Sequence, residues 1–267
     1  MYLDKADAAT VQVTEGRYGR MLSIACDQYM GHALRHYGEY SESEVHLWRQ
    51  LLADTPNAIV VDAGANIGAH TVALSRMVPK GAVFAFEPLR YTYYVLCGNL
   101  ALNGCANVFP HLSALGAERG EITVPGIDYT QGGNYGGIAL GTIERGNPVP
   151  VVALDDILPA LHFLKADVEG MELDVLKGAA RLIRECQPVL YLENNPGDQR
   201  QPLIDYVHSI GYDCWWHYAP HYNPDNHHQR LPHAEEYARI VSHNMLCLPS
   251  GPDHQFEGLE KIERGDA

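Results

Sequence analysis

The feature that most restricts the fold is a series of short apolar segments that alternate with helical patterns from about residue 58 onward. The segments are rich in β-branched or aromatic residues and almost continuously apolar, as expected for strands buried on both faces. They are IVVDAG (59–64), AVFAFEP (82–88), NVFPHLSAL (107–115), FLKADVEG (163–170) and PVLYLEN (188–194). The helical patterns between them include HTVALSRMV (70–78), YTYYVLCGNLALNG (91–104), MELDVLKGAARLIRE (171–185) and QPLIDYVHSIG (201–211). This order predicts an α/β fold with a doubly wound, mostly parallel sheet.

Two regions depart from this alternation. Residues 118–155 contain EITV, the glycine-rich stretch QGGNYGG and VPVVAL, which indicate extra extended segments around a flexible flap. Residues 212–249 predict two final antiparallel strands separated by a long polar loop insert, in which Tyr218 and Tyr222 could line a pocket or anchor the loop. We expect an N-terminal cover (1–55), one ligand-binding domain (56–250) and a polar C-terminal tail (251–267).

Charge and composition argue against several classes of protein. With 33 acidic and 19 basic residues the formal net charge is −14, so the mean surface field would repel a nucleic-acid backbone. The sequence contains no stretch of about 20 apolar residues, the length that a membrane-spanning helix needs. The residues MYLDKADAAT lack the features of a secretory leader. The six cysteines form no CxxC pair. We expect a cytoplasmic protein with no nucleic-acid or membrane partner.

The first predicted strand runs into a glycine-rich turn that also contains an acid. In VVDAGANIGAHT (60–71), Asp62 precedes Gly64, Asn66 and Gly68. Glycines allow a tight turn and a close approach of the backbone to a ligand, and the N-terminus of the following helix offers free N–H groups. A second acid, Glu87, ends the next strand, where a carboxylate can accept hydrogen bonds from two ribose hydroxyls. The pattern predicts a ligand that contains a nucleoside.

The choice among such ligands depends on Asp62. A carboxylate at the turn would repel a pyrophosphate by about 1 kcal/mol or more at close range. The ammonium and sulfonium groups of S-adenosylmethionine would instead be attracted, and the carboxylate of that molecule could meet backbone N–H groups. Asp62 therefore favours S-adenosylmethionine as the cosubstrate.

These residues resemble the FkbM family of S-adenosylmethionine-dependent methyltransferases. The resemblance covers nearly the whole chain and rests on VVDAGANIGAHT, FAFEP (84–88), NLALNG (99–104), LDDI (154–157), LKADVEGMELDVLKGA (164–179) and YLENN (191–195). It implies a class I methyltransferase (Rossmann-like) fold with seven strands, and usually the methylation of an oxygen. The cofactor-binding residues it implies are Asp62, Gly64, Asn66 and Gly68 around the methionine part, Glu87 at the ribose, Pro88 at the adenine edge, and Ser113 and Ala114 at the adenine ring.

Polar residues at the ends of two later strands mark the expected acceptor side. Asp167 ends FLKAD, and Glu193 and Asn194 end VLYLEN. This oxygen-rich trio could hold Mg2+, which would lower the pKa of an acceptor hydroxyl, although Asp167 could equally cap the following helix. Without a metal, Asp167 or His217 would act as the base. Glu169 is expected to face the pocket as a further catalytic residue.

Other interpretations of the chain stay open. Residues 217–254 hold seven of the fourteen histidines, but their spacing favours substrate contact or surface display over zinc. A nicotinamide-dependent oxidoreductase is disfavoured by DxGxNxG in place of GxGxxG, and a nucleic-acid amino methyltransferase by DVEG in place of an Asn/Asp-Pro-Pro-aromatic segment. A non-catalytic carbohydrate- or partner-binding module is the third alternative. We expect an O-methyltransferase for a hydroxyl of a small metabolite or glycan, of sugar or polyketide type, and a homo-oligomer is compatible with this.

Overall fold

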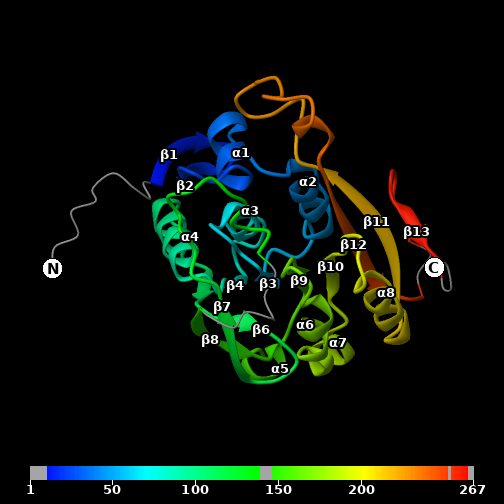
Figure 1. Cartoon of the computed structure of the whole chain (residues 1–267). Coiled ribbons are helices and arrows are strands. Elements are labelled where there is room, and N and C mark those ends of the chain that lie inside the picture. The colour runs from blue at the N-terminus through cyan, green and yellow to red at the C-terminus, as the bar shows by residue number, and fades with distance from the viewer. Residues whose placement is uncertain (1–10, 139–145, 252–253, 264–267) are drawn as a thin grey trace.

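The computed structural model describes residues 11–138, 146–251 and 254–263, and an eight-stranded sheet forms its centre (Figure 1). The strands, from edge to edge, are β13 (Glu260–Ile262), β11 (Tyr212–Pro220), β12 (Val241–Pro249), β10 (Val189–Glu193), β9 (Phe163–Ala166), β3 (Ile59–Ala63), β4 (Ala82–Phe86) and β5 (Val108–His111). The five strands from β10 to β5 are parallel, and β12 is antiparallel to both neighbours. The predicted doubly wound, mostly parallel sheet is confirmed.

Helices cover both faces of this sheet (Figure 1). One face carries α2 (Glu42–Leu51), α3 (Ala69–Met77) and α4 (Arg90–Leu102), and the other carries α5 (Leu154–Ile157), α6 (Glu172–Lys177), α7 (Ala180–Cys186) and α8 (Arg200–Ser209). Val60 and Val61, which are neighbours on β3, are both fully buried and enter the two opposite cores. Because successive strand residues point to opposite faces, a continuously apolar strand requires helices on both sides.

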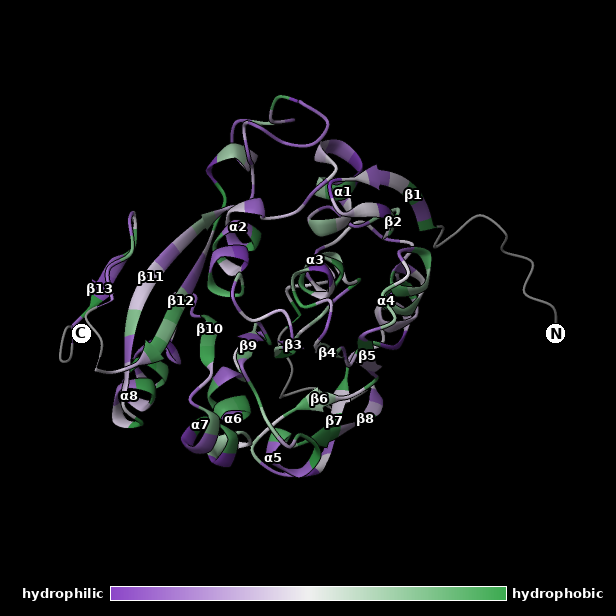
Figure 2. Cartoon of the chain, turned by 180° about the vertical axis from the view of Figure 1, so that it is seen from behind, coloured by the Kyte–Doolittle hydropathy of each residue, from purple (hydrophilic) through white to green (hydrophobic). Residues whose placement is uncertain are grey.

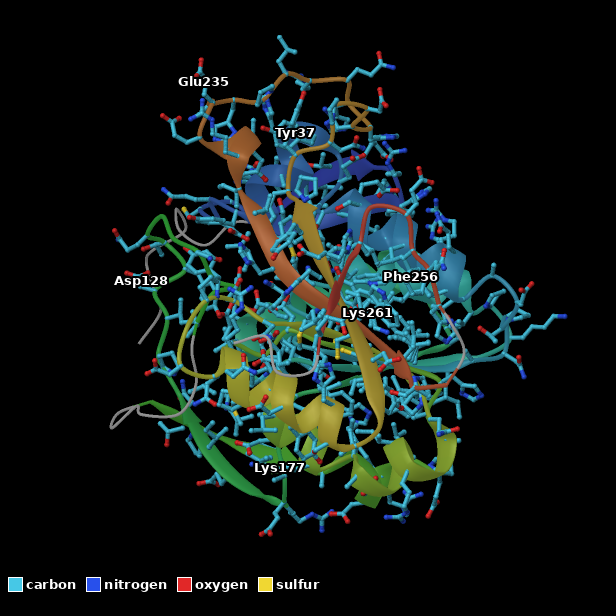
Figure 3. The ribbon with its side chains drawn as sticks, turned by 90° about the vertical axis from the view of Figure 1, so that its right-hand side faces the viewer. Tyr37, Asp128, Lys177, Glu235, Phe256 and Lys261 are labelled. Carbon is cyan, nitrogen blue, oxygen red and sulfur yellow. The ribbon has the colours of Figure 1, made fainter. Side chains whose placement is uncertain are left out.

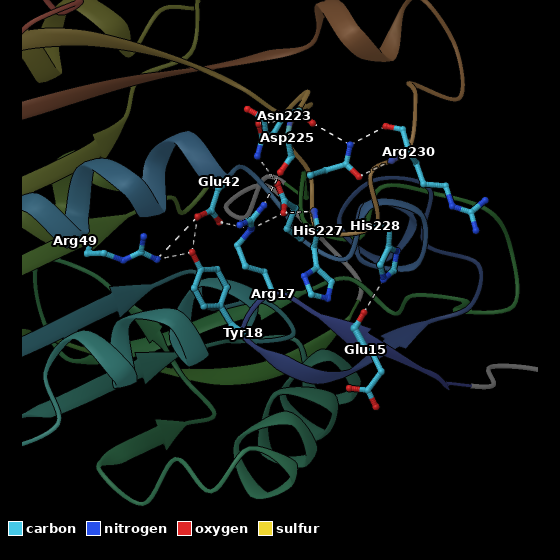
Figure 4. Close-up of polar contacts among 12 residues, drawn as sticks. Glu15, Arg17, Tyr18, Glu42, Arg49, Asn223, Asp225, His227, His228 and Arg230 are labelled. Atoms are coloured by element: carbon cyan, nitrogen blue, oxygen red, sulfur yellow. Dashed lines mark hydrogen bonds and ion pairs between the residues drawn. The ribbon is translucent and has the colours of Figure 1, made fainter.

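The N-terminal segment and the late insert pack against each other. The first consists of the hairpin β1 (Val11–Gly16) and β2 (Gly19–Ile24) and helix α1 (Met30–Tyr37), and the insert, residues 221–240, contains the short helix η1 (Tyr237–Arg239). Glu39 joins them, because it accepts hydrogen bonds from Arg17 (2.6 Å), Asn223 (2.8 Å) and the backbone N–H of His227 (2.8 Å), in the network drawn in Figure 4. Figure 2 shows the insert as largely hydrophilic and β10 as hydrophobic.

A smaller sheet lies beside the end of β5. It contains β6 (Ala114–Leu115), β8 (Asn147–Val152) and β7 (Gly120–Val124), so the extra extended segments expected within residues 118–155 are present. The glycine-rich stretch 131–137 lies outside these strands, and Tyr135 within it is buried. The segment 139–145 of the same region lies outside the described residues.

Local structure differs from the sequence patterns at two places. The run 107–115 is not one strand, because β5 ends at His111 and β6 joins a different sheet. Pro110 fits this arrangement, since β5 is an edge strand and proline cannot donate to a ladder. The pattern 171–185 is two helices separated near Gly178, whose missing side chain admits the carbonyl of Gly116: a Cβ there would lie 2.0 Å from that oxygen.

The strand count differs from the expected seven because the C-terminal segment adds β13 to the edge of the sheet. Phe256 and Lys261, labelled in Figure 3, belong to this segment and both contact Trp215 of β11. Residues 252–253 and 264–267 of the expected tail lie outside the described part.

The six cysteines are free thiols. None of the helices in the described ranges has the length and apolar character needed to cross a bilayer.

Candidate active site

A cavity of about 370 Å³ opens at the carboxyl ends of β3, β4, β9 and β10, where ligands bind in open α/β sheets. Nine of the residues predicted for the site line it: Gly64, Asn66, Glu87, Pro88, Ser113, Ala114, Asp167, Glu169 and Glu193. Four predicted residues, Asp62, Gly68, Asn194 and His217, do not line it. The cavity thus brings together the two groups that the sequence placed on the cofactor side and on the acceptor side.

The turn after β3 has the tight geometry that its glycines suggest. Gly64 has a φ of +75°, and a Cβ on it would lie 1.8 Å from the carbonyl oxygen of Asp167. Asn66 has a φ of +50° and its side-chain oxygen accepts the N–H of Ile67. Only glycine adopts such angles without strain, and asparagine tolerates them better than most residues. The turn therefore passes directly over the end of β9.

The N–H groups of this turn are already engaged within the protein. Those of Gly64 and Ala65 donate to the carbonyl of Phe86, that of Asn66 donates to Glu87, and that of Gly68 donates to the carbonyl of Ala65. With the Ile67 bond, all five N–H groups from residue 64 to residue 68 have internal acceptors. These five N–H groups are therefore not free to meet the cosubstrate carboxylate, and the free N–H groups expected at the N-terminus of the following helix, α3, stay a prediction.

The structure also gives Asp62 a position that differs from its predicted role in cosubstrate binding. Its side chain is fully buried, forms an ion pair with Lys165 Nζ at 3.1 Å and accepts the hydroxyl of Thr71 at 2.7 Å. Burial lowers the pKa of Lys165, but the charges of Asp62 and Asp167 outweigh this effect and raise it overall. The charge of Asp62 is thus paired beneath the turn, and its side chain does not line the cavity. The sequence signal for Lys165 was a lone lysine inside an apolar strand, and it was missed.

Gly68 has a packing role instead of a binding role. It is the N-cap of α3 with a φ of +87°, and a Cβ on it would lie 2.6 Å from Leu96 Cδ1 of α4. A larger residue would therefore require the Leu96 side chain to move. The conformation needed here is the left-handed one that glycine adopts most readily.

Glu87 lies at the cofactor end of the cavity. It is buried, and its two carboxylate oxygens accept the N–H groups of Asn66 (2.9 Å) and Leu89 (2.8 Å). Burial raises its pKa to about 7, and the two backbone hydrogen bonds counteract that rise. Each oxygen keeps a lone pair for a ligand hydroxyl. Glu87 therefore connects the turn after β3 with the end of β4 and presents a carboxyl group to the cavity.

Three carboxyl groups gather at the other end of the cavity. Asp167, Glu169 and Glu193 each offer an oxygen, and these oxygens lie within 4.8 Å of one another. Burial, and next the charge of Asp167, raise the pKa of Glu169 to about 7 and that of Glu193 to about 10. Such shifts are typical of carboxylates that lie close together with too little positive charge nearby.

The composition of this trio corrects the predicted metal site. Asn194 follows Glu193 at the end of β10, and its side chain is buried away from the cavity, where it donates to the carbonyl of Arg200 at 3.2 Å. Glu169 takes its place, from a backbone with a φ of +54°. The alternative role for Asp167 as a helix cap is not what the structure has: Met171 is the N-cap of α6. Instead Glu172 accepts the N–H of Val168 at 2.9 Å.

The histidine at the cavity is His221, not His217. His217 lies on β11 with its ring bonded to the hydroxyl of Tyr191 at 2.8 Å, outside the cavity lining. His221 lines the cavity together with Tyr40 and Ser242, and its Nε2 lies 2.8 Å from the hydroxyl oxygen of Ser242. Burial lowers the pKa of both histidines to about 4, so they are neutral at pH 7.

Tyr218 of β11 and Tyr222 of the insert do not line the cavity, whereas the glycine-rich stretch does. Tyr218 is exposed, and Tyr222 packs on Tyr37 with the ring centroids 5.5 Å apart, which anchors the insert to α1. Asn134 and Tyr135, by contrast, line the cavity. One wall of the site is therefore built from the stretch 131–137.

Comparisons with known proteins agree with this architecture. A family model described as the methyltransferase FkbM domain matches residues 62–214. Methyltransferase sdnD of Sordaria araneosa is 30% identical over 162 residues, which cover 48% of this chain and 62% of the relative. Hexuronic acid methyltransferase AglP of Haloferax volcanii is 28% identical over 137 residues, which cover 49% of this chain and 54% of the relative. The chain thus matches little more than half the length of these curated relatives.

The solved structure of the methyltransferase FkbM of Methylobacillus flagellatus superposes on this protein with a TM-score of 0.50 at 22% sequence identity. The superposed region covers 72% of this chain and 44% of the chain of that structure. The sheet order, the helices on both faces and the cavity at the carboxyl ends of the parallel strands define a class I methyltransferase fold. The family model covers more than half of the chain. The protein belongs to the methyltransferase FkbM family.

Proposed function

We propose that the protein is an S-adenosylmethionine-dependent O-methyltransferase that acts on a hydroxyl of a small metabolite or glycan. The observation that carries this proposal is a single cavity with two chemically different ends. One end offers the Glu87 carboxyl group and the small residues Ser113 and Ala114, which suit a ribose and an adenine ring. The other end offers Asp167 and Glu193 to an acceptor. Family membership supports methyl transfer, and the name of the relative AglP, a hexuronic acid methyltransferase, supports a sugar as the class of acceptor but not the charge of that sugar.

The proposed reaction needs a correctly oriented acceptor oxygen, the exclusion of water and one group that accepts a proton. The acceptor oxygen attacks the methyl carbon as the carbon–sulfur bond breaks, and the hydroxyl proton passes to a nearby base. Asp167 is the proposed base, because it lines the cavity and the Lys165 ammonium lies 3.7 Å from its carboxylate. The stretch 131–137 and the wall formed by Tyr40 and His221 would exclude water from the reacting atoms.

Calorimetry tests the cosubstrate. We expect S-adenosylmethionine to bind the wild-type protein and Glu87→Gln to weaken it by about tenfold, the loss of one good hydrogen bond to a charged group. The control is Glu185→Gln, an exposed residue of α7, and thermal melting of each variant checks that the turn is intact. Tight binding of a nicotinamide dinucleotide in place of S-adenosylmethionine would establish the oxidoreductase alternative. Binding without any transfer of labelled methyl would favour the non-catalytic module.

The carboxyl trio allows a second arrangement, in which a hard cation such as Mg2+ is held by Asp167, Glu169 and Glu193 and chelates the acceptor hydroxyl. We favour direct hydrogen bonding, because burial and the charge of Asp167 raise the pKa of Glu193 to about 10, so Glu193 keeps its proton at neutral pH and needs no cation to offset a charge. Methyl transfer should therefore persist after exhaustive treatment with EDTA. Loss of transfer on chelation, with recovery on addition of Mg2+, would establish the metal-dependent arrangement.

A further inference from the structure

The cavity lacks a group that could pair with an anionic acceptor. Its described lining includes Glu87, Asp167, Glu169 and Glu193 but no lysine or arginine. An acceptor bound beside the trio would meet three carboxyl groups within a few ångströms of one another. A further negative charge at that place would be repelled in an environment that screens charge poorly.

The nearest cation is not available to an acceptor. Lys165 is 3% exposed, and its ammonium lies 3.0 Å from the carbonyl oxygen of Gly64 and 3.1 Å from Asp62, with Asp167 at 3.7 Å. The ammonium thus donates to the carbonyl oxygens of Gly64 and Ala63 and is held between the two carboxylates. His221 adds no positive charge at neutral pH, because burial lowers its pKa to about 4.

The polar groups at this end are suited to hydroxyl donors. Carboxylates only accept hydrogen bonds, and an acceptor with several hydroxyls can donate to more than one of them. Asn195, Ser242 and Tyr40 lie in the same lining and can donate to or accept from further hydroxyls. The arrangement thus rewards a molecule that carries many hydroxyls and no negative charge.

We infer that the acceptor is an uncharged polyhydroxy compound, a neutral sugar or glycan residue, and not a uronic acid or a phosphorylated sugar. This inference rests on the proposed methyltransferase function and specifies its substrate class. The trio of Asp167, Glu169 and Glu193 then acts as a charge filter in addition to any part in proton transfer.

Saturation-transfer NMR tests the inference with matched probes. The protein, saturated with S-adenosylhomocysteine and treated with EDTA, is titrated with the methyl glycosides of glucose, galactose and mannose and with the corresponding uronic acids. We expect at least one neutral glycoside to bind and its uronate partner to bind at least tenfold more weakly. Equal or tighter binding of the uronate, or binding by no neutral glycoside, would overturn the inference.

Variants identify the cause of the discrimination. The double variant Glu169→Gln, Glu193→Gln removes two of the three ionisable carboxyl groups with little change of shape, so the preference for the neutral glycoside should shrink several-fold. Glu185→Gln on α7 should leave the preference unchanged. An unchanged preference in the double variant would reject the charge-filter explanation. Calorimetry with S-adenosylmethionine separates the two levels of the argument: failure there contradicts the proposed function, whereas failure of the glycoside series alone contradicts only the acceptor class.

Discussion

Lys165 lies on the buried strand β9 with almost no exposure, and its charge is offset on both sides. Its Cα partner in the parallel pair of β3 and β9 is Asp62, and its ammonium also lies near Asp167 and the Gly64 carbonyl. A buried ion pair adds little net stability, because both charges lose their hydration. Loss of one partner is costly, since the other charge then stays buried and unpaired. Lys165 therefore holds the turn after β3 and the acceptor-side carboxylate in one fixed arrangement.

Replacement of this lysine should be far more damaging than replacement of an exposed one. Lys165→Met leaves Asp62 buried without a counter-charge, and we expect a loss of about 3–5 kcal/mol in the free energy of unfolding. Lys177→Met breaks an exposed pair with Asp174 and should cost about 0–1 kcal/mol. Urea denaturation measures both. The double variant Asp62→Asn, Lys165→Met should recover part of the loss, and similar costs for the two single variants would contradict the structural role of Lys165.

The sequence predicted strands and turns well where residues close together in the chain determine them. The continuous apolar character of 59–63 and 82–86 predicted β3 and β4, because strands buried on both faces need apolar residues at every position. The positive φ values of Gly64 and Asn66 follow from the residue types in the turn. These features depend on residues that are close in sequence, and the sequence carries them directly.

Features that depend on register between distant strands could not be predicted in the same way. Asp62 and Lys165 face each other only because β3 and β9 are aligned at these residues, and one sequence does not specify that alignment. His217 was a candidate base, but it lies within β11, which continues to Pro220, and the next residue, His221, reaches the cavity. Asn194 was misplaced because Glu193 faces the cavity and the next side chain points elsewhere.

The insert and the N-terminal segment form one element of the site although about 180 residues separate them in sequence. Glu39 bonds to Asn223 and His227. Tyr40, the residue after Glu39, and His221, two residues before Asn223, lie with their ring centroids 5.2 Å apart. Both rings line the cavity. The polar contacts of Figure 4 therefore position an aromatic wall of the site, which explains why a hydrophilic insert is held against the fold.

At the scale of the whole molecule, titratable groups of the site contribute to the dependence of stability on pH. The formal net charge is −14, and the cavity adds carboxyl groups whose ionisation burial opposes. Burial lowers the pKa of His217 and His221 to about 4, so these histidines are neutral in both folded and unfolded states above pH 7 and contribute nothing to the pH dependence there. The raised pKa of Glu193, about 10, does contribute there, because it makes the folded state less stable as pH rises.

Because the folded protein keeps the Glu193 proton that the unfolded chain loses near pH 4.5, the stability this group contributes is complete below that pH and declines as pH rises toward 10. Glu193→Gln keeps a donor toward Asp167 but removes the titration. The variant should gain on the wild type by at most about 1.4 kcal/mol per pH unit between pH 5 and 9. Urea denaturation at pH 5, 7 and 9 with EDTA measures this difference, with Glu185→Gln as the control. A difference that stays constant with pH would contradict this prediction. It would mean that ionisation of Glu193 beside Asp167 does not lower the free energy of unfolding, and that any stability cost of the carboxyl-rich site comes from other groups.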